Sequence, residues 1–197
     1  RSTRRITLFP YTTLFRSVLI IGGSGSGKSA YAEDYITKLS KDCRKYYIAT
    51  MQIYDEEGQE KVFKHQKMRE GKGFLTIEQS TDIHQAADKM EKDTTIENVG
   101  LLECMSNLVA NEMFREGQIR DCDLVKKNII DGIEELLKTV KDFIIVTNNV
   151  FEDGIVYDET TMNYIKTLGC INQELAKMAD KVIEVVVGIP IIVKEGK

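Results

Sequence analysis

Hydrophobic residues along the chain gather into short apolar runs that alternate with amphipathic stretches. Continuous apolar runs that open into polar or glycine-rich segments predict buried strands. The runs read VLIIG, KYYIA, VGLLEC and FIIVT and lie at residues 18–22, 45–49, 99–104 and 143–147. Apolar residues at helical spacing predict helices over residues 29–39, 123–140 and 160–178. This alternation is typical of an α/β protein whose mostly parallel sheet is covered by helices on both faces.

Weaker patterns complete the expected fold. They predict helices over residues 57–70 and 83–92 and from residue 106, and strands over residues 74–78, 181–187 and 189–193. The last two strands are joined around Gly188, which indicates an antiparallel pair at one edge of the sheet. Because no linker rich in proline, glycine or serine divides the chain, we expect residues 18–197 to form one domain.

The first 17 residues differ from the rest of the chain. They read RSTRRITLFPYTTLFRS, with four arginines and no acidic residue, and they lack the apolar core of a signal peptide. Residues 7–17 resemble the in-frame translation of a common sequencing-adapter oligonucleotide. The alternative is a genuine basic arm. We therefore predict that residues 1–17 are non-native and make no stable contact with the fold, and that the native start lies just before Val18.

Composition and charge exclude several classes of protein. Charged residues make up 29% of the chain, and no apolar run reaches the ~18 residues of a membrane-spanning helix. The net charge is −4 and no basic stripe is present, which argues against non-specific nucleic-acid binding. The four cysteines form no C-x-x-C pair, so neither a zinc ribbon nor a disulfide framework is predicted. Reduced thiols and a cytoplasmic location are the expectation.

A phosphate-binding loop is the strongest motif of the sequence. Residues Gly22–Ser29 read GGSGSGKS and fit the pattern G-x-x-x-x-G-K-[ST], between an expected strand and an expected helix. Glycines let backbone N–H groups surround a phosphate, and the helix N-terminus adds partial positive charge. Lys28 is placed to reach the β- and γ-phosphates, and Ser29 to ligate Mg²⁺. The alternative is a Gly/Ser turn of similar sequence. We predict binding of ATP or GTP.

Glu103 is the candidate for the acidic residue that a typical P-loop enzyme carries at the end of a second apolar strand. Its carboxylate has two candidate roles. It holds Mg²⁺, or it accepts hydrogen bonds from the N1–H and N2–H₂ groups of guanine. The bland alternative is a solvated acid at a strand end.

His65 is a candidate nucleophile. It lies in the segment EKVFKHQKMR, among several lysines and an arginine. Neighbouring cations favour the neutral, nucleophilic imidazole and attract a triphosphate. The alternative is a solvated surface histidine. The other histidine, His84, has no such setting, and we interpret it as structural.

Several segments together resemble the adenosylcobinamide kinase/adenosylcobinamide-phosphate guanylyltransferase family of cobalamin biosynthesis. The segments are VLIIGGSGSGKSAYAE, YYIATMQ, the stretch with His65 and Arg69, LLECMSNLVANEMF, IIVTNNV and INQELAKMADKVIEVVVGIP. The resemblance spans residues 18–194. The phosphate loop alone is generic, whereas the ordered combination is specific.

The resemblance implies a fold in the recombinase-like branch of P-loop proteins and a homotrimer. It implies that ATP or GTP, with Mg²⁺, phosphorylates adenosylcobinamide, and that GMP then passes from GTP to the product. His65 would carry the GMP covalently. The implied nucleotide contacts are Gly22, Gly23, Ser24, Gly25, Ser26, Gly27, Lys28, Ser29, Ala49, Thr50, Met51, Gln66, Lys67, Met68, Arg69, Glu78 and Glu103.

Some positions depart from the family pattern. Asn149 stands where an acidic residue often follows the strand-end asparagine, and Tyr157 stands in place of a proline. Residues 151–153 replace a glycine-rich turn, and Phe74 replaces a common tryptophan. These changes bear on substrate positioning. Two other functions stay open: a small-molecule kinase without guanylyltransferase activity, and a nucleotide-dependent switch or assembly ATPase.

Overall fold

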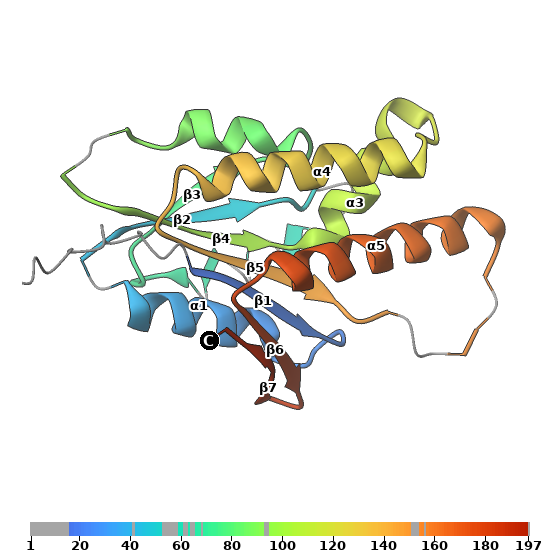
Figure 1. Cartoon of the computed structure of the whole chain (residues 1–197). Helices are drawn as coiled ribbons and strands as arrows, with labels where there is room; N and C mark the ends of the chain where they lie inside the picture. Colours follow the sequence, from blue (N-terminus) through green and yellow to red (C-terminus); the bar gives the residue numbers. More distant parts are fainter. Residues whose placement is uncertain are drawn as a thin grey trace, which may run out of the picture.

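A mostly parallel sheet organises the chain (Figure 1). The computed structural model describes residues 16–40, 42–52, 59, 60, 63, 66, 67, 69–92, 95–150, 154, 155 and 157–196. Within these residues seven strands pair in the order β3-β2-β4-β5-β1-β6-β7. The strands are β1 (Arg16–Gly22), β2 (Arg44–Ala49), β3 (Phe74–Glu78), β4 (Asn98–Glu103), β5 (Asp142–Asn148), β6 (Lys181–Val186) and β7 (Ile189–Glu195). All neighbours are parallel except β6 and β7, so the predicted fold class and its antiparallel edge are confirmed.

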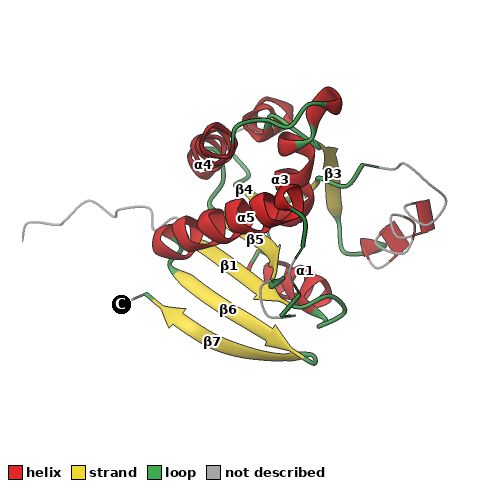
Figure 2. Cartoon of the chain, turned by 90° about the vertical axis from the view of Figure 1, so that its right-hand side faces the viewer, coloured by secondary structure: helices red, strands yellow, loops and turns green. Residues whose placement is uncertain are grey.

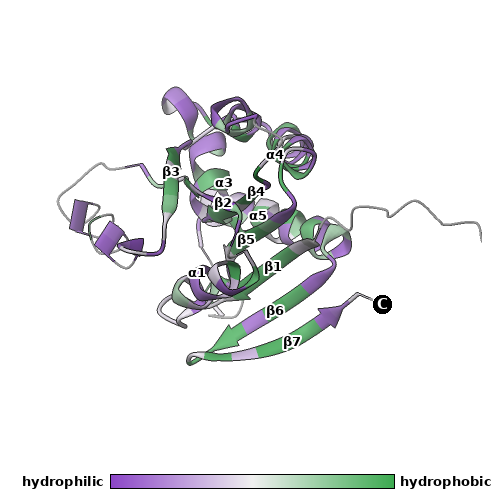
Figure 3. Ribbon diagram, turned by 90° about the vertical axis from the view of Figure 1, so that its left-hand side faces the viewer, coloured by the Kyte–Doolittle hydropathy of each residue, from purple (hydrophilic) through white to green (hydrophobic). Residues whose placement is uncertain are grey.

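Helices cover both faces of this sheet (Figure 1). They are α1 (Lys28–Leu39), α3 (Met105–Met113), α4 (Cys122–Leu137) and α5 (Glu159–Met178), with 3₁₀ segments η1 (Ile83–Lys89) and η2 (Arg115–Gly117). One face packs on α1, and the other packs on α3, α4, α5 and η1. Neighbouring strand residues alternate between the two cores, as Leu19 and Ile20 do, because successive side chains leave a strand on opposite sides. The central strands are accordingly apolar along their length (Figure 3).

The hairpin between β6 and β7 stands at the edge of the sheet (Figure 2). Its turn residues Val187 and Gly188 have φ values of 45° and 83°. Two successive residues in this region form the tight turn that matches the twist of antiparallel strands. The Gly188 N–H donates to the Ser26 carbonyl at 2.8 Å, so the hairpin tip is tied to the loop that follows β1.

Two of the helices expected from the sequence need comment. One differs in type, and the other falls largely on residues that the structure does not describe. The helix expected over residues 83–92 is a 3₁₀ segment that ends at Lys89. Ile83 and Ala86 are both fully buried, and their spacing of three suits the three-residue turn of a 3₁₀ helix. The helix expected over residues 57–70 lies largely outside the described residues, although those described between 59 and 69 are helical.

The expectation that residues 1–17 make no contact with the fold is wrong for its last two residues. Strand β1 begins at Arg16, and Ser17 is in register with Phe143 of β5. The Ser17 N–H and hydroxyl donate to Asp180 Oδ2 at 2.8 and 3.0 Å, and the Asp180 N–H donates back to the Ser17 carbonyl. Ladder hydrogen bonds use only the backbone, so a strand can extend through any residues that precede it. Residues 1–15 lie outside the described part of the chain.

None of the helices in the described residues combines the length and the apolar character that crossing a membrane requires.

Replacing Asp180 with alanine is expected to destabilise the fold. The substitution removes the acceptor for both donors of Ser17, a buried residue. The loss should cost about 1–3 kcal/mol of unfolding free energy, or roughly 2–4 °C in melting temperature for each kcal/mol. Thermal unfolding of Asp180→Ala checks it. Asp88→Ala is the matched control, because Asp88 is exposed and its contact with Lys92 is 3.8 Å long. Equal melting temperatures for both variants would contradict the prediction.

Candidate active site

The phosphate loop lies between the end of β1 and the start of α1, as the motif predicts. Gly27, the residue before α1, has a φ of 89°, a conformation that glycine adopts without strain. A Cβ atom at Gly22 would lie 2.6 Å from the Val185 carbonyl oxygen, so only glycine fits beside β6. The Lys28 ammonium donates to the Gly23 carbonyl at 3.2 Å across the loop. Backbone N–H groups, helix N-terminus and lysine are thus gathered in an anion-binding arrangement.

Ser29 and Glu103 meet beside this loop. The Ser29 hydroxyl donates to Glu103 Oε1 at 2.7 Å, although the two residues come from α1 and the end of β4. The other carboxylate oxygen, Oε2, is buried without a hydrogen-bond partner. Burial raises the pKa of Glu103 to about 7, against the opposing effects of the Ser29 hydroxyl and the Lys28 charge. A hydroxyl and a strand-end carboxylate in this position are the protein groups that hold Mg²⁺ in P-loop enzymes.

The carboxyl ends of β2, β3 and β4 form one edge of the sheet next to the loop. Ala49 is in register with both Glu78 and Glu103, so three of the predicted nucleotide contacts lie in a row. Thr50 is buried, and its hydroxyl donates to the Cys104 carbonyl at 2.8 Å and accepts from the Cys104 N–H. Met51 follows at a half-buried position, and the Glu78 side chain is exposed. The structure therefore brings residues 49–51, Glu78 and Glu103 to the same edge.

The described residues after position 65 approach the same region. The Arg69 guanidinium lies 3.7 Å from the centre of the Tyr47 ring, and Arg69 is buried. Lys72 pairs with Glu33 Oε2 at 2.9 Å and with Asp34 at 3.0 Å. Glu33 is fully buried in α1, and its Oε1 atom has no partner. This ionic network ties the segment after position 65 to α1.

Sequence reasoning missed Glu33, Tyr47 and Lys72. A signal for Glu33 was present, because it follows Ser29 by one helical turn and so shares its face of α1. His65 and Met68 lie outside the described residues. Gln66 and Lys67 are exposed, and His84 is exposed on η1.

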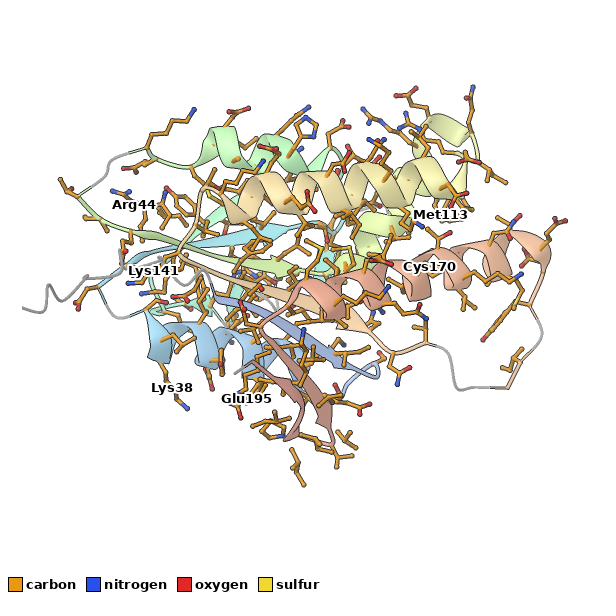
Figure 4. All side chains as sticks on the ribbon, in the orientation of Figure 1. Lys38, Arg44, Met113, Lys141, Cys170 and Glu195 are labelled. Carbon is orange, nitrogen blue, oxygen red and sulfur yellow. The ribbon has the colours of Figure 1, made fainter. Side chains whose placement is uncertain are left out.

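The opposite edge of the sheet carries basic side chains that form ion pairs with acidic residues. Arg44 and Lys141, labelled in Figure 4, lie at the amino ends of β2 and β5. Arg44 pairs with Glu91 at 3.0 Å, and Lys141 pairs with Glu97. These cations are therefore engaged away from the phosphate loop.

A cleft of about 920 Å³ opens on the β6 side of the phosphate loop. Its walls are residues 23–26, the end of β5, the end of β6 and the first half of α5. Asn148 Nδ2 donates to the Ser106 hydroxyl at 2.7 Å, and its Oδ1 is buried without a partner. The Tyr164 hydroxyl donates to the Ser106 carbonyl at 3.2 Å. The two departures from the family pattern at Asn149 and Tyr157 both line this cleft.

The sequence comparisons with known proteins agree on one family. The sequence profile of the family described as cobinamide kinase / cobinamide phosphate guanyltransferase (CobU) matches residues 18–193. The bifunctional adenosylcobalamin biosynthesis protein CobU of Escherichia coli strain K12 is 30% identical over 187 residues, which are 90% of this chain and 99% of that protein. Its counterpart in Salmonella typhimurium strain LT2 is 31% identical over 189 residues, with 90% and 99% covered. Among solved structures, an ATPase domain superposes with a TM-score of 0.49 at 10% identity, covering 86% of this chain and 68% of that one.

The raised pKa of Glu103 predicts a pH dependence of stability in the nucleotide-free protein. Between the usual value of 4.5 and about 7, the folded state binds more protons than the unfolded state. The contribution of Glu103 to stability is therefore full below pH 4.5 and is lost as the pH rises through 7. Glu103→Gln lacks this titration, so its melting temperature should rise relative to the parent protein between pH 5 and 8. Glu134→Gln, at an exposed position of α4, is the control and should follow the parent. Parallel pH curves for Glu103→Gln and the parent would show that the carboxyl group is not perturbed.

Proposed function

The chain belongs to the cobinamide kinase / cobinamide phosphate guanyltransferase family, and we propose that it carries out both reactions through a covalent guanylyl-histidine. In the first reaction ATP or GTP phosphorylates the hydroxyl group of adenosylcobinamide. In the second, GMP passes from GTP to the phosphorylated product, giving adenosylcobinamide-GDP. The observation that carries the proposal is the phosphate loop with Ser29 and Glu103 in contact, within a family match over residues 18–193.

The kinase reaction depends mainly on positioning and charge neutralisation. The loop N–H groups and Lys28 hold the β- and γ-phosphates. Ser29 and Glu103 would hold Mg²⁺, and the buried, unpartnered Oε2 of Glu103 fits such a ligand. Two protein oxygens suit Mg²⁺, which keeps several waters and binds substrate phosphates directly. When bound, the ion neutralises charge on the phosphates. We therefore propose that Glu103 holds Mg²⁺ rather than guanine, which the hydrogen bond between its Oε1 and the Ser29 hydroxyl supports.

The guanylyltransferase reaction replaces one displacement with two. The His65 imidazole nitrogen attacks the α-phosphorus of GTP and forms an N–P bond, while pyrophosphate leaves. A phosphate oxygen of the cobinamide product then attacks the same phosphorus, and the N–P bond breaks. Supporting the assignment, Arg69 and Lys72 follow His65 closely in sequence and are held against Tyr47 and Glu33. The described residues that follow His65 are therefore held against β2 and α1.

A homotrimer is the proposed assembly. The β6–β7 hairpin supports self-association, because its apolar side chains are exposed along an edge strand. Those more than half exposed are Val187, Ile189, Ile192 and Val193. We also propose a cytoplasmic location, which the four free thiols support.

Incubation with GTP and Mg²⁺ alone should add one GMP to the protein and release pyrophosphate. Intact mass and peptide mapping should place the adduct on His65. As a phosphoramidate it should survive alkali and be lost in mild acid, because protonation makes the imidazole a good leaving group. His65→Ala should form no adduct yet still phosphorylate adenosylcobinamide. His84→Ala is the matched control and should form the adduct normally.

Other outcomes of this experiment would indicate another function or another site. Phosphorylation of adenosylcobinamide without any adduct would leave a kinase alone. Nucleotide hydrolysis that responds only to a protein partner, with neither reaction, would indicate a switch or assembly ATPase. An adduct on His84 would preserve the chemistry and refute the site.

The substitution Glu103→Gln should weaken the binding of ATP and the binding of GTP to the same extent. If Glu103 holds Mg²⁺, the lost charge affects both triphosphates, by about tenfold or more, since charge-assisted contacts contribute about 1.5–3 kcal/mol. Competition binding in excess Mg²⁺ measures both affinities, and the two proteins should differ little when Mg²⁺ is chelated. A loss confined to GTP would assign Glu103 to the guanine edge instead.

A further inference from the structure

We propose that the cleft on the β6 side of the phosphate loop is the site where the kinase reaction binds its acceptor, cobinamide. The inference rests on the proposed kinase function and names the substrate site that the phosphate loop itself does not supply. Three observations support it independently: the position of the cleft, the chemistry of its lining residues, and the buried polar atoms in its wall that lack partners.

The position of the cleft places a ligand beside the transferred phosphate. Residues 23–26 belong both to the phosphate loop and to the cleft wall. The groups assigned to nucleotide and Mg²⁺ lie toward β4, β2 and β3, whereas the cleft lies toward β6 and α5. Figure 2 shows the two sides of β1, with the β6–β7 hairpin on one and β3 on the other. The acceptor and the nucleotide therefore reach the loop from different sides.

The walls of the cleft suit a large ligand that is not phosphate-rich. Its described lining residues include no lysine or arginine, and Glu184 is the one carboxylate among them. Val150, Ile165 and Val185 add apolar surface, while Asn149 and Thr161 add polar groups. A nucleotide requires cations and N–H donors around its phosphates. Cobinamide is instead a bulky cationic corrin ring with amide side chains, and its chemistry matches a mixed wall with one carboxylate. A volume of about 920 Å³ is at the upper end of small-molecule sites.

Two buried oxygen atoms in the cleft wall lack a hydrogen-bond partner. They are Asn148 Oδ1 and Ser26 Oγ. Because Asn148 Nδ2 donates to the Ser106 hydroxyl, Oδ1 is the amide atom that is left as an acceptor without a partner. Buried polar atoms of this kind are normally satisfied, so a bound hydroxyl donor fits this one.

The reaction follows from that placement. With its O–H directed to Asn148, the acceptor oxygen forms a bond to the γ-phosphorus while the bond to the β–γ bridging oxygen breaks. ADP or GDP leaves toward the nucleotide side, and the hydroxyl proton passes to water. Asn148 orients the acceptor and takes up no proton, which suits a reaction that depends on positioning. Asn149 and Tyr157 line the same cleft, so two of the departures of this chain from its family pattern fall where the acceptor binds, whereas Phe74 lies on β3.

A substitution that fills the cleft tests the proposal. Ile165→Trp adds bulk inside the cleft, and Lys166→Trp adds the same bulk at the next, exposed position of α5. In the full chain, Ile165→Trp should raise the KM for adenosylcobinamide by about tenfold or more. Its KM for ATP and its GMP loading from GTP should not change. Equilibrium dialysis of adenosylcobinamide without nucleotide should show the same loss of affinity. Lys166→Trp should match the parent protein in every measurement.

A second variant covers the case in which Ile165→Trp fails to fold. Val186→Trp also lines the cleft and starts from a side chain that is 42% exposed, so it should fold and give the same shift for adenosylcobinamide. If both variants keep the parent affinity for adenosylcobinamide, or if the KM for ATP rises instead, the cleft is not the acceptor site. If the parent protein phosphorylates no cobinamide at all, the kinase function is overturned, and the acceptor site with it.

Discussion

The hydrogen bond from Ser29 to Glu103 is the contact on which the arrangement of the site depends. Its two residues are 74 positions apart in sequence and meet only because β5 is placed between β1 and β4 in a parallel sheet. Parallel order brings strands β1 to β6 to their carboxyl ends at the same edge, where α1 also begins. A shift of either strand by one residue would direct its side chains to the opposite face. The registers of β1 with β5 and of β4 with β5 thus determine where a phosphate and its counter-ion fit.

The price of this contact is a buried acidic group. Glu103 and Glu33 lie near each other, and the charge of Glu33 adds to burial in raising the pKa of Glu103. The two carboxylates lie among the cations Lys28, Arg69 and Lys72. One oxygen atom of each carboxylate still lacks a hydrogen-bond partner. Buried charge of this kind is costly unless it is paired, and sites that bind cations and phosphates are where proteins retain it. Four of the six buried side-chain atoms without a partner among the described residues belong to the phosphate loop, to α1, or to the ends of β4 and β5 beside the loop, namely those of Ser26, Glu33, Glu103 and Asn148. A ligand bound at the loop can complete groups of this kind.

Short-range patterns predicted most of the fold. The apolar runs and the glycine-rich loop located the strands and α1 to within a few residues, because burial and loop geometry are both encoded locally. The order of the strands was not predictable in this way, so the meeting of Ser29 with Glu103 and the wall shared by Asn148 and Glu184 became visible only in the structure. The expectation that residues 16 and 17 make no contact with the fold was wrong because a strand extends by backbone pairing without regard to sequence origin. The helix expected from residue 83 is a 3₁₀ segment, because apolar residues three positions apart are as typical of a 3₁₀ turn as of an α-helix.

The bond between the Gly188 N–H and the Ser26 carbonyl joins the tip of an edge hairpin to the middle of the phosphate loop. Because that bond spans a solvent-facing turn, the fluctuations of the two segments are coupled: the loop cannot rearrange around an incoming phosphate without releasing or carrying the hairpin tip. Whatever immobilises the hairpin also restricts the loop and lowers the conformational entropy that remains to be lost when nucleotide binds. Subunit contacts made through this hairpin would therefore pre-organise the phosphate site from outside it.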